Sequence, residues 1–226
     1  MRSLAFASKV ACVLSVSFML GLACRHSPNS DPELEELLQT LTLAATADAA
    51  GSCTTSTEGG SQVLTIRATS QTNFTLCDLS NGTRIEPGAS DTGDISLQRF
   101  KAATYSGTSA TGGGGGACQT GVTNFDSVTS VSAFGGVSAP DCPQFIDDEP
   151  LVGASVGGGT VNFNGSAALK DWYLYNIFTN ALSAREDVYI IRSSDGSAFY
   201  KLQMLDYYDP AGTSGYPKFR YAEITP

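Results

Sequence analysis

The sequence predicts an all-β fold, an antiparallel sandwich or a partly closed barrel, with a short N-terminal tether helix. Apolar and polar residues alternate with a period of two from Ser61 onward, which is typical of strands. The dipeptides Asn81-Gly82 and Asp195-Gly196 are turn signals beside such runs. No sustained helical period follows residue 50, so the folded part is expected to consist of packed sheets.

Residues 1–23 have the pattern of an export signal. Arg2 and Lys9 precede an apolar run, residues 10–23, that is shorter than the roughly 20 residues needed to span a bilayer. The motif Leu20-Gly21-Leu22-Ala23-Cys24 resembles a lipobox of the relaxed, spirochaete type. We therefore expect cleavage before Cys24, a lipid anchor (with palmitate) on this cysteine, and an outer-membrane location with display at the cell surface. The alternative is ordinary secretion with Cys24 as a free thiol.

Residues 24–60 are expected to form a tether between this anchor and the β domain. Asp31 can cap a helix and Pro32 suits its first position. The leucines that follow share one helical face: Leu34, Leu37, Leu38 and Leu41. Residues 44–60 are rich in Ala, Thr, Ser and Gly and are interpreted as a linker. The β domain is then residues 61–226.

Four cysteines remain in the exported part and are expected to form two disulfides. They are Cys53, Cys77, Cys118 and Cys142. Disulfides persist in exported proteins, and four cysteines allow three pairings. Local loop closure favours Cys53–Cys77 and Cys118–Cys142. A zinc site is the competing interpretation, but the chain has no CxxC spacing and its one histidine, His26, lies beside the anchor.

Strands are expected at both ends of the domain, and long loops between them. The predicted strands are residues 61–68, 74–79, 94–103, 188–193, 198–208 and 219–225, with a further candidate at 128–134. Residues 105–165 hold more than half of the 24 glycines and are interpreted as a loop expansion. Alternation places Tyr200, Leu202 and Met204 on one face of their strand and Lys201, Gln203 and Tyr207 on the other.

Composition and motifs exclude several classes of function. A formal net charge of −9 argues against nucleic-acid binding. The run of glycines at 112–116 has no Lys-Ser/Thr after it, so it is not a phosphate-binding loop. With His26 in the tether, no histidine can serve as a general base, and we expect no enzyme. The acidic run Asp147-Asp148-Glu149 is interpreted as a solvated loop and fits no EF-hand.

Two segments of the domain resemble the HmuY family of bacterial haem-binding lipoproteins. One is the strand motif Asp94-Ile95-Ser96-Leu97-Gln98-Arg99-Phe100-Lys101, followed by Ser106-Gly107-Thr108-Ser109. The other runs from Asp171-Trp172-Tyr173-Leu174-Tyr175-Asn176 through Val188-Tyr189-Ile190-Ile191-Arg192 to Phe219-Arg220-Tyr221. The resemblance implies an all-β surface lipoprotein and, for some members, capture of haem between two axial ligands.

The positions at which the resemblance implies axial ligands carry Gln98 and Asn180. Carboxamides are poor ligands for haem iron. The remaining candidates are His26 beside the anchor, nine tyrosines and Met204, which alternation also fits to the core. We therefore consider a binding lipoprotein that captures haem with atypical ligands, through stacking on aromatic side chains or through a tyrosinate. The alternative is an adhesion module without a cofactor, which binds a host or surface protein or glycan.

Overall fold

The computed structural model describes residues 51–86, 93–132, 144–152 and 162–226. The residues of the expected signal peptide, the expected lipid-anchor residue Cys24, the residues of the expected tether helix and His26 lie outside the described residues. The all-β prediction is confirmed, since the described residues contain fourteen strands and one helical element, the 3-10 turn η1 (Phe125–Ser127). None of the described helical residues forms a segment long and apolar enough to cross a bilayer.

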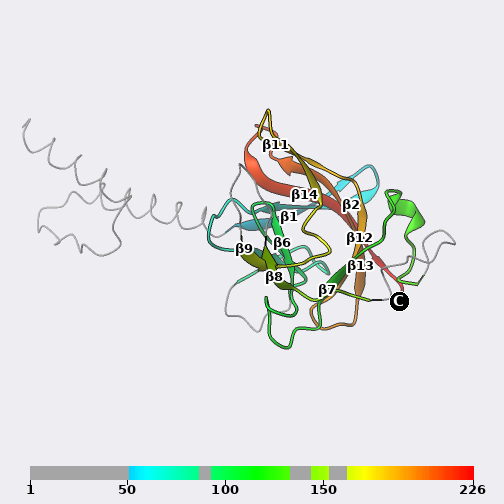
Figure 1. Ribbon diagram of the computed structural model, residues 1–226. Coiled ribbons are helices and arrows are strands. Elements are labelled where there is room, and N and C mark those ends of the chain that lie inside the picture. Colours follow the sequence, from blue (N-terminus) through cyan, green and yellow to red (C-terminus); the bar gives the residue numbers. More distant parts are fainter. Residues whose placement is uncertain (1–50, 87–92, 133–143, 153–161) are drawn as a thin grey trace, which may run out of the picture. The chain divides into compact units, whose positions relative to one another are not determined.

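Two larger sheets form the domain (Figure 1). The six-stranded sheet has the order β1-β2-β14-β13-β12-β7: β1 (Ser52–Glu58), β2 (Ser61–Arg67), β14 (Ser214–Ile224), β13 (Phe199–Tyr208), β12 (Val188–Arg192) and β7 (Gly116–Gln119). The four-stranded sheet has the order β4-β3-β5-β6: β4 (Arg84–Ile85), β3 (Thr75–Cys77), β5 (Ile95–Gln98) and β6 (Lys101–Thr104). Two hairpins complete the fold: β8 (Glu149–Val152) with β9 (Asn162–Gly165), and β10 (Tyr173–Asn176) with β11 (Ala181–Ala184). All these pairings are antiparallel.

The main hydrophobic core draws on both larger sheets. Leu64 and Ile66 of β2 and Leu202 of β13 join Ile95 and Leu97 of β5, and all five are fully buried. Strand alternation explains this arrangement, because every second residue points to the same face. The two sheets therefore pack as a sandwich, and within the described residues neither sheet closes into a barrel.

The strand β12 is buried on both of its faces, which explains its unbroken apolar run. Tyr189 and Ile191 belong to the main core, whereas Val188 and Ile190 pack into a second cluster with Phe125 of η1. A strand covered on both faces reads as continuously apolar. The turn predicted at residues 194–197 joins β12 to β13, with the Gly196 amide donating to the Ser193 carbonyl.

The buried carboxylate of Asp94 links the two larger sheets. It accepts the Leu79 amide at 2.8 Å, and it accepts the Ser194 amide, from the β12–β13 turn, at 2.9 Å. Burial raises the pKa of Asp94, and these two backbone donors oppose the shift.

The sheet begins earlier than the expected domain boundary at residue 61. Residues Ser52–Glu58, which were interpreted as linker, form β1 and pair along their full length with β2. As an outer strand of the sheet, β1 has mostly exposed side chains, so it lacks the apolar alternation that identifies strands. Its turn uses Gly59 and Gly60, both with positive φ.

Three further sequence expectations differ from the structure. The single strand expected over residues 94–103 is a hairpin, β5 and β6. Residues 128–132 of the candidate strand 128–134 form isolated bridges, at Val128 and between Ser130 and Thr225, and residues 133–134 lie outside the described residues. Tyr207 joins the main core, because register shifts after Met204 turn the end of β13 over.

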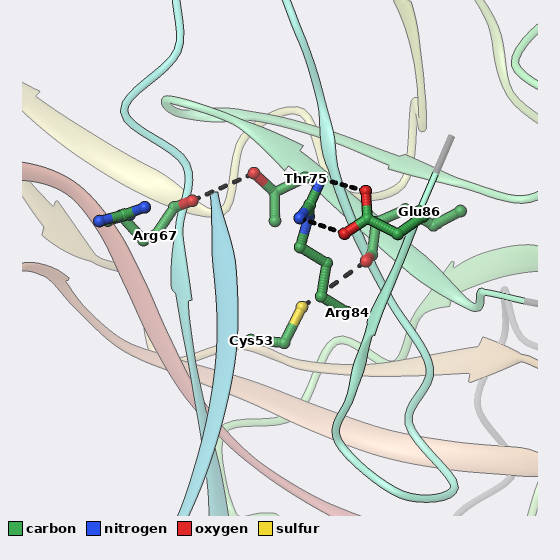
Figure 2. A network of polar contacts seen from close by, with 6 residues as sticks. Cys53, Arg67, Thr75, Arg84 and Glu86 are labelled. Carbon is green, nitrogen blue, oxygen red and sulfur yellow. Dashed lines mark hydrogen bonds and ion pairs between the residues drawn. The ribbon is translucent and has the colours of Figure 1, made fainter. Parts of the chain in front are cut away.

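The disulfide Cys53–Cys77 is present and joins β1 to β3, with a Cα–Cα distance of 6.1 Å. The Cys53 sulfur lies 3.6 Å from the carbonyl oxygen of Leu76. The Thr75 hydroxyl donates to the Arg67 carbonyl at 3.1 Å (Figure 2). Cys118 is also disulfide-bonded. Its pairing with Cys142 stays a prediction, since residue 142 lies outside the described residues.

Candidate functional site

Two neighbouring cavities lie beside the β5–β6 hairpin. The larger, cavity A, has a volume of about 630 Å³ and lies on the face of the four-stranded sheet that points away from the core. Ile95 and Leu97 of β5 point into the core, so Ser96 and Gln98 point into cavity A. Strand β9 supplies the opposite wall: Asn162, Phe163 and Asn164.

The smaller cavity, cavity B, has a volume of about 370 Å³. Its walls come from the β5–β6 turn, from the β10–β11 turn and β11, from the end of β13 and from the start of β14: Arg99, Phe100, Asn180, Leu182, Tyr207, Tyr208 and Ser214. Gln71 and Lys101 line both cavities, so the two spaces adjoin at these side chains.

The turn between the cavities is built around Arg99. This residue has a φ of 56°, in the left-handed region that non-glycine residues seldom adopt. Its amide donates to the Ala68 carbonyl at 2.7 Å, and its guanidinium donates to the Ser214 hydroxyl at 2.8 Å. These bonds hold the strained turn in place and keep a positive charge at the wall of cavity B.

The cavity walls are cationic although the chain is acidic. Among the described residues that line either cavity, Arg84, Arg99 and Lys101 are basic and none is an aspartate or glutamate. Arg84 is paired with Glu86 by two hydrogen bonds of 2.6 and 2.9 Å at the edge of the sheet (Figure 2). Burial lowers the pKa of Lys101, whose ammonium donates to the Gln98 side-chain oxygen at 3.0 Å. A net charge of −9 makes this local positive lining a distinctive feature.

An exposed apolar hairpin tip lies next to cavity B. Ile177 and Phe178, between β10 and β11, are 69% and 90% exposed. The Asn176 side-chain oxygen accepts the Phe178 amide at 2.9 Å, which fixes the turn. Asn180 at the end of the same turn lines cavity B. Exposed large apolar side chains beside a cavity are typical of a ligand-contact surface.

The structure places the three predicted ligand positions apart. Gln98 lines cavity A and is buried, and Asn180 lines cavity B and is exposed. Met204 is fully buried in the main core and lines neither cavity. Sequence reasoning did not identify Arg99 and Lys101 as wall residues, because it placed both within one continuous strand.

Asp148 is buried, so the interpretation of residues 147–149 as a solvated loop is wrong for this residue. Its carboxylate accepts the Thr104 amide at 2.7 Å and the Thr104 hydroxyl at 3.0 Å. Its backbone carbonyl accepts the amide of Thr108, a residue that lines cavity A. Burial raises the pKa of Asp148 to about 6, against the lowering effect of hydrogen bonds from Ser109 and Thr104.

The described residues contain no group of three or more His, Cys, Asp or Glu side chains that could hold a metal ion. The chemistry of the cavity walls is instead that of cations, carboxamides and aromatic rings. Such walls suit an anionic or polar ligand with an apolar body.

Comparison with known proteins identifies related folds. The model of the HmuY protein family matches residues 70–221. An apo HmuY analog of Tannerella forsythia shares 18% identity and a TM-score of 0.53, over 76% of this chain and 96% of that chain. A protein of Bacteroides vulgatus ATCC 8482 described as HmuY-like and heme-binding shares 17% identity and a TM-score of 0.51, over 71% and 90%.

A lipoprotein of Bacteroides fragilis NCTC 9343 shares 18% identity and a TM-score of 0.50, over 71% of this chain and 89% of that chain. At such identities the likeness concerns the fold. The search of curated proteins finds no match.

Proposed function

Because the chain belongs to the HmuY protein family, we propose that it is a membrane-anchored extracytoplasmic lipoprotein that captures haem. The observation that carries this proposal is the cationic lining of two adjoining cavities on an acidic chain. Haem is a flat apolar macrocycle with two carboxylates. It therefore needs apolar surface for its plane and positive charge at its edge.

The walls of cavity B meet both needs. Phe100, Tyr207 and Tyr208 offer aromatic surface, and the exposed Phe178 belongs to the hairpin turn that ends at the wall residue Asn180. Arg99 and Lys101 are placed to receive the carboxylates. The described residues thus fit the macrocycle and its acidic groups. They do not fit imidazole ligation of the iron, because His26 is the one histidine in the chain and lies outside them.

The anchoring part of the proposal rests on the residues before the domain. The lipobox-like motif ending at Cys24 supports lipid attachment, and a Bacteroides fragilis structure with the same fold is described as a lipoprotein. We place the domain at the outer membrane, displayed at the cell surface. Labelling cells with radioactive palmitate tests the anchor, and a Cys24→Ser variant should carry no label.

Titration of the purified protein with haemin tests the binding function. We expect a shifted Soret band and quenching of Trp172, the one tryptophan of the chain. The Trp172 ring lies 5.9 Å from the ring of Tyr207, which lines cavity B, so a bound porphyrin would quench it. No spectral change and no quenching at tens of micromolar haemin, roughly the weak end of useful affinities, would refute haem capture.

Cavity A favours a second candidate, an adhesion module that binds a surface glycan or protein. Four carboxamide side chains line it: Gln71, Gln98, Asn162 and Asn164. Phe74 and Phe163 supply aromatic surface among them. Carboxamides both donate and accept hydrogen bonds and so suit neutral hydroxyl-rich ligands. Glycan-array binding in the absence of haemin binding would favour this candidate.

A further inference from the structure

We infer that this site recognises the porphyrin macrocycle and its carboxylates without any side-chain ligand to iron, so that metal-free porphyrin binds as well as haemin. The inference rests on the proposed function and specifies the ligand class as tetrapyrroles irrespective of their metal. It follows from the state of the two carboxamides at the expected ligand positions, the two phenols of cavity B and Met204.

The two carboxamides at the expected ligand positions are already engaged. The Gln98 side-chain oxygen accepts the Lys101 ammonium at 3.0 Å. The Asn180 side-chain oxygen accepts the Tyr175 hydroxyl. Carboxamide nitrogen has no free lone pair for a metal, so each side chain has only its oxygen to offer, and that oxygen already accepts a hydrogen bond.

The phenols of cavity B are likewise unsuited to holding iron. Tyrosine binds haem iron as the phenolate. Burial raises the pKa of Tyr207 to about 12, which keeps this side chain protonated. The Tyr208 oxygen accepts the Leu182 amide at 2.8 Å, which ties it to β11. Moving Tyr207 toward iron would remove its core contacts, and moving Tyr208 would break the hydrogen bond with the Leu182 amide.

Met204 is held within the main core by its neighbours on both sheets. Its side chain is fully buried and contributes to neither cavity wall. Exposing the sulfur would require the middle of β13 to leave the six-stranded sheet, where it pairs with Phe219 of β14. Affinity must then come from the ring plane and the carboxylates, which haemin and protoporphyrin IX share.

The test compares haemin with protoporphyrin IX on the same purified full chain, with Trp172 quenching as the common readout. We expect the Kd values for haemin and protoporphyrin IX to agree within about fivefold. This ratio is small beside the several powers of ten over which Kd values of ligands range. The Gln98→Ala and Asn180→Ala variants should keep the Soret position of bound haemin. His26→Ala and Tyr105→Phe serve as controls for ligands from the tether and from cavity A.

The outcomes separate the inference from the function. Haemin binding at least about a hundredfold tighter than protoporphyrin IX would overturn metal-independent recognition and leave haem capture in place. Loss of the Soret shift in any one of the variants at Gln98, Asn180, His26 or Tyr105 would identify that residue as an iron ligand. It would also overturn metal-independent recognition and leave haem capture in place. Failure of both porphyrins to quench Trp172 would overturn the proposed function and the inference together.

Discussion

The indole nitrogen of Trp172 donates to the carbonyl oxygen of Phe100 at 2.8 Å. This bond joins the segment before β10 to the β5–β6 turn, 72 residues away in the sequence. Trp172 is fully buried in the main core, and Phe100 lines cavity B. A single hydrogen bond therefore couples core packing to the position of the cavity wall.

Replacing Trp172 with phenylalanine should destabilise the domain and loosen this wall. The variant loses buried volume and leaves the Phe100 carbonyl without its donor, which together cost about 3 kcal/mol. Urea unfolding followed by circular dichroism measures the loss. Phe178→Leu is the control, because that ring is exposed and its change should leave the free energy of unfolding nearly the same. Equal stabilities for wild type and Trp172→Phe would contradict the coupling.

Asp148 should make the domain more stable as the pH falls from 8 to 4. The native carboxyl has a pKa raised from 3.8 to about 6, so the folded state holds this proton more tightly than the unfolded state. Protonation therefore stabilises the native fold, by about 3 kcal/mol across this range.

The Asp148→Asn variant should lose this pH dependence in urea unfolding at several pH values. Asp147→Asn is the matched control, since its side chain is 64% exposed and the dependence should persist. An Asp148→Asn curve parallel to wild type would show that Asp148 titrates normally. Asp94, whose pKa is also raised, contributes in the same direction to both proteins and cancels in the comparison.

The Cys53–Cys77 disulfide should contribute about 3 kcal/mol to the free energy of unfolding. It closes a loop with a sequence separation of 24 and so restricts the unfolded chain. A Cys53→Ala, Cys77→Ala double variant compared with wild type in urea measures this contribution. An unchanged unfolding midpoint would mean that the two sheets need no covalent link at this edge.

Phe178 should matter for ligand binding and not for stability. The Phe178→Ser variant should bind haemin about tenfold more weakly, because an apolar contact at the opening is lost. Its unfolding free energy should change by less than about 0.5 kcal/mol, as expected for an exposed position. Val152→Ser, at an 80% exposed position on β8, should change neither quantity. An equal loss of haemin affinity in Phe178→Ser and Val152→Ser would indicate a general effect of removing apolar surface.

Lys101 should strengthen binding of an anionic ligand at the junction of the cavities. The Lys101→Met variant keeps the apolar stem and removes the charge, and we expect about a tenfold rise in the Kd for haemin. Binding to the variant should also depend less on salt concentration. Lys170→Met, which alters a half-exposed lysine that lines neither cavity, is the control. Unchanged affinity in Lys101→Met would place the carboxylates elsewhere.

The strands that bury one or both faces could be predicted from the sequence, and the exposed edges could not. The β12–β13 hairpin follows from an apolar run, a turn signal at Asp195-Gly196 and an alternating strand. Strand β1 has no alternating apolar pattern, because its serines and threonines mostly face solvent. Tyr207 was assigned to the wrong face because a register shift in β13 cannot be seen in a period of two.

The candidate site was less predictable than the fold because it depends on an unusual turn. The left-handed position of the β5–β6 turn is occupied by Arg99 and not by glycine or asparagine, the residues that normally mark such a turn. The sequence therefore contains no signal for this turn. Asp148 is buried next to the exposed Asp147, and composition cannot separate the two. The burial of Asp148 depends on contacts with residues that are distant in the sequence, such as the hydrogen bond from the Thr104 amide.

The position of β14 in the six-stranded sheet has a consequence for how the chain acquires its fold. β14 lies between β2 and β13 (Figure 1). Within the described residues, the N-terminal hairpin β1–β2 joins the rest of this sheet through residues 218–221 of β14. The hairpin β1–β2 therefore cannot join the six-stranded sheet until β14, at the C-terminal end of the domain, is in place. Folding of this domain is then a late, concerted event, and the chain stays accessible to chaperones and proteases until β14 arrives.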